Sequence, residues 1–176
     1  MSEEPFRPMR RSQQQMDDSE NRRVLTKMTS GVLALQVGNG GYPYAVPLSY
    51  VLHDNVLYFH SAVEGHKIEA VKRCGKASFC VIEQDQVLAE KFTTAYRSVI
   101  VFGDVCIVQD EAERRLALKL LAEKYSPGVS QAKVNNNIET GLKRVAILRF
   151  EIIHLTGKQG RQTIEMAKIS ETKKGD

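Results

Sequence analysis

Short runs of alternating apolar and polar residues, separated by turn-forming residues, constrain the fold of this chain more than any other feature. In residues 42–52, large apolar side chains recur at every second position and therefore share one face of a strand: Tyr44, Val46, Leu48, Tyr50 and Leu52. Turn-forming residues flank this run, at 38–41 before it and at 53–55 after it. With further strands at 32–37 and 56–61, we expect a three-strand antiparallel meander.

Three further runs extend the β pattern toward the C-terminus. Residues 77–83, 96–108 and 144–157 are rich in Val, Ile and Phe, which favour strands. Gly103 lies inside the second of these runs and indicates a bend or a bulge. Strands joined by meander links, with helices between them, predict an antiparallel barrel with helices packed outside it.

Helical patterns occur between the strands. The first covers residues 19–29, where Asp18 or Ser19 can cap the N-terminus, and a shorter one covers residues 64–73. The polar residues 129–142 are ambiguous, and we expect a loop that contains a helical turn.

The clearest helix begins at Asp110. The spacing of Asp110 and Glu113 resembles a capping box, which favours a helix start. Residues 126–128, Ser-Pro-Gly, end the pattern. The apolar residues of this helix repeat at helical spacing and are expected to form its buried stripe: Leu116, Leu120 and Leu121.

The ends of the chain differ in composition from its middle. Residues 1–18 are polar and rich in arginine, so we expect an extended N-terminal arm. Residues 19–165 contain no repeat and no Gly/Ser linker, which predicts a single domain. Residues 166–176 are expected to be a frayed, charged tail.

Charge and hydropathy narrow the classes of partner. Lys and Arg number 25 against 21 Asp and Glu, a mild excess that suits an anionic ligand but does not argue for nucleic acid. We find no run apolar enough to cross a membrane and no apolar signal segment at the start, so we expect a cytoplasmic protein. The cysteines, Cys74, Cys80 and Cys106, lack C-x-x-C spacing and are expected to be buried, reduced thiols rather than metal ligands.

The segment FHSAVEGHKIEAV, residues 59–71, is the strongest candidate for a ligand site. A strand ends near Ser61, passes Gly65 and enters a helix that carries Lys67. Free N–H groups at a helix start, with an ammonium group beside them, can bind a phosphate. The alternative is structural: Ser61 and Glu64 have capping-box spacing, and Lys67 is then merely solvated.

Two other segments carry polar groups that could line a pocket. Pro47 cannot donate to a sheet ladder, so Pro47-Leu48-Ser49-Tyr50 is expected at an edge, where backbone groups could bind a planar heterocycle. Tyr96 and Ser98 share one face of the 96–108 strand and could line a pocket or a subunit interface, whereas Arg97 points the other way. An ordinary protected edge and a half-buried strand tyrosine are the structural alternatives.

The chain resembles the pyridoxamine 5′-phosphate oxidase-like proteins, and most closely their nitroimidazole-resistance (Nim) branch. The resemblance covers residues 6–158. It is carried by FRPMRR at 6–11, YPYAVPLSYV at 42–51, LYFHSAVEGHK at 57–67, FCVIEQD at 79–85, YRSVIVFG at 96–103 and LTGK at 155–158.

The resemblance implies a six-stranded antiparallel split β-barrel of Greek-key type, with peripheral helices, that forms a homodimer with FMN at the subunit interface. Four groups of residues then contact the cofactor. The residues against the ring would be Pro47, Leu48, Ser49 and Tyr50, and those at the ring edge and ribityl chain would be His60, Ser61 and Ala62. The phosphate would be bound by His66 and Lys67. Tyr96 and Ser98 would lie on a strand that reaches the site, in one arrangement from the partner subunit. His60 also matches the position of a reactive histidine.

Three functions follow from these expectations. In the first, the protein is an FMN-dependent oxidoreductase that passes electrons from a reduced nicotinamide cofactor or another donor to a small aromatic acceptor, for example a nitro compound. Only Arg161 follows the last strand, so an arginine pair for pyridoxamine phosphate is missing and that reaction is not expected. In the second, the barrel is a non-catalytic module that holds flavin or haem, with His60, His66 or His154 as the haem ligand. In the third, it is a structural dimer without a ligand.

Overall fold

A computed structural model describes residues 6–38 and 41–172, and the side chains up to Ala167. The turn residues Asn39 and Gly40, the first five residues of the arm and the last four of the tail therefore lie outside the described part. The strands are β1 (Gln15–Met16), β2 (Ser30–Leu35), β3 (Tyr44–Ser49), β4 (Val51–His53), β5 (Val56–Ala62), β6 (Lys76–Leu88), β7 (Thr93–Ile107) and β8 (Val145–Gln159). The helices are α1 (Asp18–Lys27), α2 (His66–Arg73), α3 (Glu111–Tyr125), α4 (Gln131–Gly141) and α5 (Arg161–Thr172), with short 3-10 helices η1 (Ser12–Gln14) and η2 (Ala89–Lys91).

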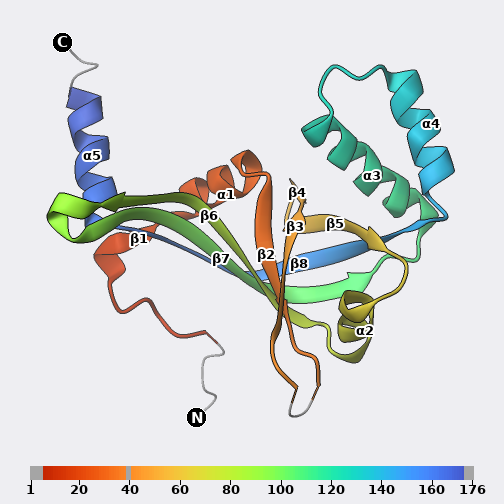
Figure 1. The fold of residues 1–176 in the computed structure, drawn as a ribbon, viewed down its shortest axis with the longest axis horizontal. Coiled ribbons are helices and arrows are strands. Elements are labelled where there is room, and N and C mark those ends of the chain that lie inside the picture. Colours follow the sequence, from red (N-terminus) through yellow and green to blue (C-terminus); the bar gives the residue numbers. More distant parts are fainter. Residues whose placement is uncertain (1–5, 39–40, 173–176) are drawn as a thin grey trace. The chain divides into compact units, whose positions relative to one another are not determined.

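The strands form one mainly antiparallel sheet, which confirms the expected fold class (Figure 1). The sheet has eight strands rather than six, in the order β3-β2-β6-β7-β8-β5-β4, and the short β1 pairs with β8. Within the described residues, hydrogen-bonded pairing does not close the sheet into a ring. Its two edge strands, β3 and β4, are consecutive in the chain and are separated only by Tyr50.

The expected three-strand meander is wrong. β2 pairs with β3 and β4 pairs with β5, so residues 42–52 form two strands that belong to different hairpins. Tyr50 and Val51 are both buried, at 0% and 8% exposure, and two adjacent side chains cannot lie on one face of a regular strand. The Tyr125 hydroxyl accepts from the Tyr50 N–H at 2.9 Å and donates to the Tyr50 carbonyl at 2.7 Å, so a side chain satisfies the backbone where the strand breaks.

The chain divides into two compact units. Unit 1 comprises residues 1–28, 80–100 and 154–176, and unit 2 comprises residues 29–79 and 101–153. Strands β6, β7 and β8 contribute residues to both units. The units are described separately below.

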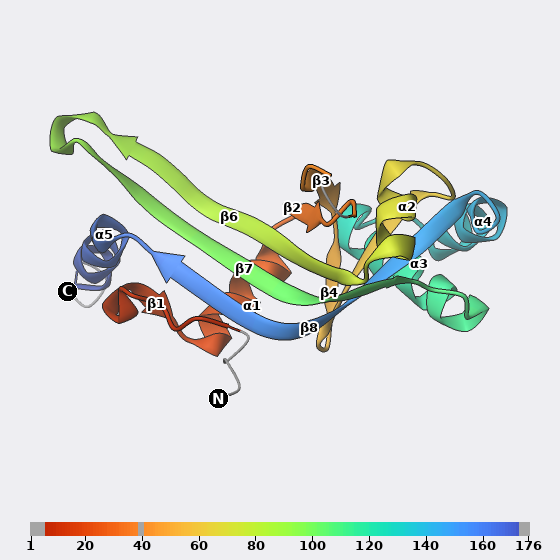
Figure 2. The ribbon, with the colours of Figure 1, turned by 90° about the horizontal axis from the view of Figure 1, so that it is seen from below.

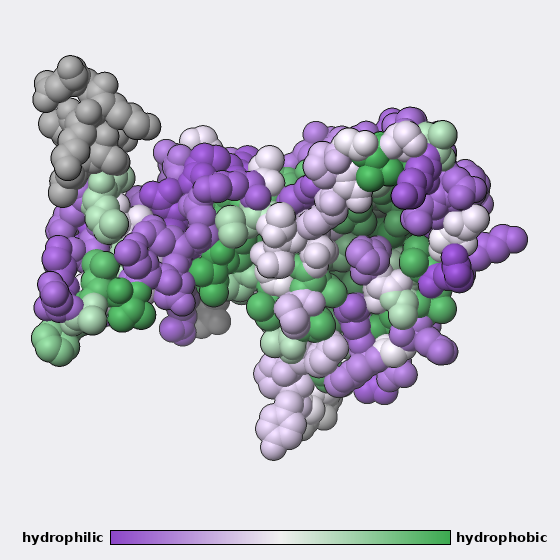
Figure 3. Space-filling view, turned by 45° about the horizontal axis from the view of Figure 1, so that its top comes forward, coloured by the Kyte–Doolittle hydropathy of each residue, from purple (hydrophilic) through white to green (hydrophobic). Residues whose placement is uncertain are grey.

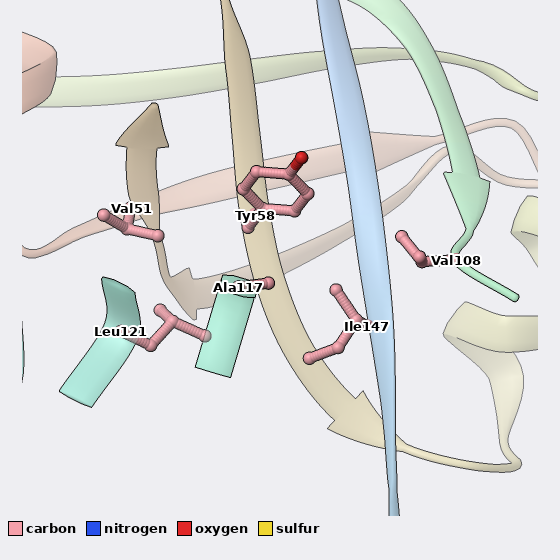
Figure 4. Packing of buried hydrophobic residues seen from close by; sticks show 6 residues of the cluster. All are labelled: Val51, Tyr58, Val108, Ala117, Leu121 and Ile147. Atoms are coloured by element: carbon pink, nitrogen blue, oxygen red, sulfur yellow. The ribbon is translucent and has the colours of Figure 1, made fainter. Parts of the chain in front are cut away.

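In unit 2, helix α3 packs on the sheet through a cluster of buried apolar residues (Figure 4). Ala117 and Leu121 of α3 point toward Tyr58 of β5 and Ile147 of β8. The Asp110 side chain accepts from the Glu113 N–H at 2.7 Å, so the predicted helix start is confirmed. The predicted stripe is wrong at Leu116, which is 40% exposed, because Ala117 occupies the position that faces the sheet.

Residues 129–142 differ from the expected loop, because most of them form helix α4. The helix is polar, and α3 supports it: the Arg115 guanidinium pairs with the Glu139 carboxylate and also with Glu111, one turn earlier on α3. Figure 1 shows α3 and α4 side by side. Local sequence alone gave no signal for this helix, because its stabilising partner lies on another helix.

A second buried cluster of unit 2 consists of aromatic rings. The rings of Tyr50, Phe59 and Phe79 meet at centroid distances of 4.9–6.4 Å, and all three side chains are fully buried. Such pairs stabilise a core beyond the area they bury. Tyr50 therefore serves the core, and its ring is not open to a ligand that lies on the surface of β3.

In unit 1, the N-terminal arm and the C-terminal segment both have defined structure. Residues 12–14 form η1, and β1 pairs with β8 through Met16 and Gly157, so the arm is not wholly extended. Helix α1 begins one residue earlier than expected, because Asp17 rather than Asp18 or Ser19 accepts from the Glu20 N–H, at 2.8 Å. The expected frayed tail from residue 166 instead continues helix α5 to Thr172.

Surface features complete the description. Apolar side chains reach the surface at several places on the face seen in Figure 3, and Cys106 is exposed rather than buried as expected. No helix among the described residues is long and apolar enough to span a membrane.

Candidate functional site

Helix α2 of unit 2 begins without a side-chain cap. Its N-cap is Gly65, whose backbone has φ +116° and ψ 175°, and no side-chain hydrogen bond caps the helix. The positive φ suits glycine because an L side chain rarely adopts it. The alternative capping box of Ser61 and Glu64 is not formed, because the helix starts only at His66. The first N–H groups of α2 are thus free of side-chain acceptors among the described residues, as an anion site requires.

Lys67 lies in the first turn of this helix. Its side chain is half-buried, and burial lowers the pKa of its ammonium group. Within the described residues, Lys67 forms no ion pair. A partly desolvated ammonium without a counter-ion is stabilised by an incoming anion, so Lys67 and the helix start favour the same kind of ligand.

An aromatic contact joins this helix start to the edge strand. The ring of Tyr44, on β3, lies 4.4 Å from the His66 ring, centroid to centroid, at an interplanar angle of 31°. Strand β3 also contacts β5, so the structure brings three of the predicted segments together in unit 2. Sequence analysis did not select Tyr44 for the site, although the alternation placed it on one face of β3 with Val46 and Leu48.

The predicted edge position of Pro47 is confirmed. β3 is the last strand of the sheet order, and Pro47 pairs in register with Val32 of β2. Along β3, Pro47 and Ser49 are exposed and Leu48 is half-buried. Pro47 and Ser49 can therefore meet a ligand on the open face, whereas Tyr50 is enclosed in the core.

On β5 the predicted residues divide between two faces. His60 and Ala62 are exposed, whereas Ser61 is 8% exposed and points the opposite way. His60 pairs in register with Ile147 of β8, so its backbone is fixed within the sheet. In this structure the imidazole of His60 is accessible and the Ser61 hydroxyl is not.

Tyr96 and Ser98 lie on β7 within unit 1, whereas the segments described above belong to unit 2. Both are half-buried and alternate with the buried Ala95 and Val99, so they share the less buried face of the strand. Arg97 points to the other face, as predicted.

The largest hollow described in unit 2 has a volume of about 660 Å³ and lies at the end of β2. It is mostly apolar, with the ammonium of Lys76 and the hydroxyl of Ser78 on its β6 side and Phe102 on its β7 side. Lys76 is paired with Asp104 at 2.6 Å. None of the residues predicted to contact a cofactor lines this hollow, and no sequence pattern identified it.

The fold and site define a class: a mainly β, antiparallel protein with an uncapped, lysine-bearing helix after an edge hairpin. A family model described as pyridoxamine 5′-phosphate oxidase matches residues 17–159. The chain belongs to this family. A search of curated proteins found no match.

Solved structures agree with this assignment at the level of fold. A candidate 5-nitroimidazole antibiotic resistance protein from Bacteroides thetaiotaomicron is 21% identical, with a TM-score of 0.65, over 82% of this chain and 86% of that one. A FAD-binding protein from Mesorhizobium loti is 25% identical, with a TM-score of 0.59, over 83% and 96%. A FAD- and haem-binding protein from Mycobacterium smegmatis is 18% identical, with a TM-score of 0.66, over 84% and 74%.

Proposed function

We propose that this protein binds FMN, with the cofactor phosphate at the N-terminus of α2. The observation that carries the proposal is the uncapped helix start at Gly65 with the half-buried ammonium of Lys67 in its first turn. Both features favour an anion, and neither has a structural partner among the described residues. His66, held against Tyr44, lies beside them.

Family membership favours a flavin over other phosphorylated ligands. Proteins with this fold include ones described as FAD-binding and as FAD- and haem-binding. The exposed backbone edge of β3 at Pro47 and Ser49 suits a planar ring system, and β5 adds the accessible side chain of His60. We infer that the ring lies along these two strands, with Ala62 near the ribityl chain; Ser61, whose side chain is buried, could contribute only through its backbone.

We further propose that two copies of the chain associate. Ile100 and Phe102, on the less buried face of β7, are 40% and 37% exposed, and a partner could cover them. In a closed twofold dimer each chain could also supply Tyr96 and Ser98 to its partner's cofactor. A native mass equal to two chains is expected at micromolar concentration, and a single-chain mass would contradict the dimer.

The proposed activity is reduction of a small aromatic nitro compound at the expense of a reduced nicotinamide cofactor. FMN, when bound, supplies the electron transfer. The chain itself binds the phosphate through Lys67, orients the ring along β3 and β5, and presents His60 where a substrate could take a proton from its imidazole.

The test is the uptake of FMN by the apoprotein, followed by quenching of flavin fluorescence. In Lys67→Gln we expect FMN affinity to fall by roughly 10- to 100-fold, since a charge-assisted contact to phosphate is lost. Lys72→Gln is the matched control, because Lys72 lies in the last turn of the same helix and is exposed. Wild-type protein that binds no FMN, or equal affinity in all three proteins, would refute the proposed site.

A further inference from the structure

Unit 1 contains a hollow that the proposed flavin site does not use. Two adjoining cavities, each about 490 Å³, share Lys27 of α1, Glu83 of β6, Arg97 of β7 and Ala167 of α5 as lining residues. In Figure 2, the ends of β6 and β7 that η2 connects run side by side toward α5. Strand β7 is hydrogen-bonded to the start of α5. The Gly160 N–H and the Thr163 hydroxyl donate to the Tyr96 carbonyl, at 2.8 Å and 3.1 Å.

A nearly buried carboxylate stands at the centre of this hollow. The Glu83 side chain is 8% exposed and accepts from both terminal nitrogens of Arg23, at 2.8 Å and 2.9 Å. It also accepts from Lys27 Nζ at 3.2 Å and from Arg97 Nη1 at 3.3 Å. The hydrogen bonds from Arg23, and then that from Lys27, lower the pKa of Glu83 to about 2 against the opposing effect of burial, so the carboxylate stays charged at neutral pH.

The cations around Glu83 outnumber the carboxylates. Among the side chains that the structure describes, Arg23, Lys27 and Arg97 pair only with Glu83 and Glu20, which leaves one positive charge in excess within this cluster. Lys27 is the least engaged, with one contact of 3.2 Å and a side chain that is 63% exposed. Glu83 is buried but Lys27 is largely exposed, so solvent partly screens the attraction of this charge for an anion.

The Arg97 guanidinium has one N–H donor that is not used within the described part of the chain. Its Nη2 donates to Gln159 at 2.9 Å, whereas its Nε is buried and has no hydrogen-bond partner among the described residues. A buried donor without an acceptor is unfavourable. An additional acceptor near this guanidinium would therefore be stabilising, provided that the side chain adjusts to expose its donor edge.

The α5 wall of the hollow is largely apolar. It is formed on α5 by Ile164, Met166 and Ala167, and Met166 is 43% exposed. A bare inorganic anion would leave this wall uncovered, whereas a molecule with an apolar body would cover it. Volume, charge and wall chemistry together select a ligand with one negative group and a compact apolar part.

We propose that this hollow of unit 1 binds a small organic carboxylate, whose carboxylate pairs with Lys27 and Arg97 and whose apolar body lies on α5. The site is independent of the flavin proposal, because every residue that carries it belongs to unit 1 and none is assigned to the flavin. Glu83 acts here as a positioning residue that holds the cations in place.

The test is a calorimetric titration of the full-length protein, as purified, with benzoate and with its neutral analogue benzamide. Benzoate is expected to bind, and benzamide at least about tenfold more weakly, because it lacks the charge. Lys27→Gln should weaken benzoate by about tenfold, whereas Lys119→Gln, an exposed lysine of α3, should leave it unchanged.

A second variant tests the proposal independently in case Lys27→Gln does not fold. Met166→Asp places a negative charge on the apolar wall and should also abolish benzoate binding, while melting shows that the protein remains folded. The proposal would be overturned if wild type bound no benzoate or bound benzamide as tightly as benzoate. It would also be overturned if inorganic phosphate competed for the site as strongly as benzoate itself. Retained benzoate affinity in a folded Lys27→Gln or Met166→Asp protein would do so as well.

Discussion

At Gly103, β7 leaves no room for a side chain beside β8 in unit 2. A Cβ built on Gly103 would lie 1.9 Å from the Glu151 carbonyl oxygen and 2.5 Å from the Phe150 ring. At this position of β7 only hydrogen fits, and the bend or bulge at Gly103 stays a prediction. Backbone atoms cannot swing aside as the end of a flexible side chain can.

Gly103→Ala is therefore expected to destabilise the protein by about 1–3 kcal/mol or more, through overpacking against β8. Chemical denaturation measures the change. Gly141→Ala is the control: among the described residues, no atom beyond its chain neighbours and the backbone of its own helix lies within 4 Å of its Cβ position, and in the last turn of α4 alanine should be neutral or mildly stabilising. Equal effects of the two substitutions would contradict the close approach.

Glu83 gives a pH-dependent prediction at the same scale. Its pKa is lowered from 4.5 to about 2, chiefly by hydrogen bonds from Arg23. Because the folded pKa lies below the unfolded one, this contribution to stability is fully present above pH 4.5 and disappears as the pH falls toward 2.

In Glu83→Gln we expect a loss of about 1–3 kcal/mol at pH 7 and a flatter dependence of unfolding free energy on pH between 4.5 and 2. Glu90→Gln, at an exposed position of η2, should follow the wild-type curve. Urea denaturation at a series of pH values measures both. A variant curve parallel to the wild-type curve would show that Glu83 titrates normally in the folded protein.

At the scale of elements, the break between β3 and β4 depends on a distant side chain. The Tyr125 hydroxyl, at the end of α3, accepts from the Tyr50 N–H, and its single proton is shared between the carbonyls of Tyr50 and Thr29. It fixes the path of the edge strand that carries Pro47 and Ser49.

Tyr125→Phe removes this bridge and leaves the buried backbone of Tyr50 unsatisfied, which should lower stability by about 1–3 kcal/mol. Flavin affinity should fall with it if the β3 edge contacts the ring. Tyr42→Phe, at a side chain that is 92% exposed, should leave the melting temperature unchanged. An unaltered melting temperature in Tyr125→Phe would mean that water replaces the hydroxyl.

The elements that sequence predicted well are those determined locally. The Asp110–Glu113 spacing located the start of α3, and turn residues at 53–55 located the β4–β5 hairpin. The division of residues 42–52 was missed because its cause, Tyr125, lies 75 residues from Tyr50 in the chain. Helix α4 was missed for a similar reason, since an ion pair to α3 supports a polar segment.

The candidate site shows the same limit. Glycine and lysine spacing predicted the helix start at Gly65, which is local, and the structure removed the competing capping box. The contact between Tyr44 and His66 joins a strand to a helix, so no local pattern specified it. Similarly, the cluster around Glu83 draws on α1, β6 and β7, which the sequence does not place together.

At the scale of the whole molecule, family membership and the uncapped helix start support one proposal, that the phosphate of a flavin binds at the start of α2. Riboflavin has the same ring and ribityl chain as FMN but lacks the phosphate. The ratio of the two affinities therefore isolates the phosphate from every contact made by the ring.

The decisive measurement is this ratio in wild type and in Lys67→Gln, from fluorescence titrations at fixed ionic strength. We expect wild type to bind FMN roughly 10- to 100-fold more tightly than riboflavin, and the preference to shrink by about tenfold in the variant. Equal wild-type affinities for FMN and riboflavin, or a preference that Lys67→Gln leaves intact, would contradict a phosphate at this helix.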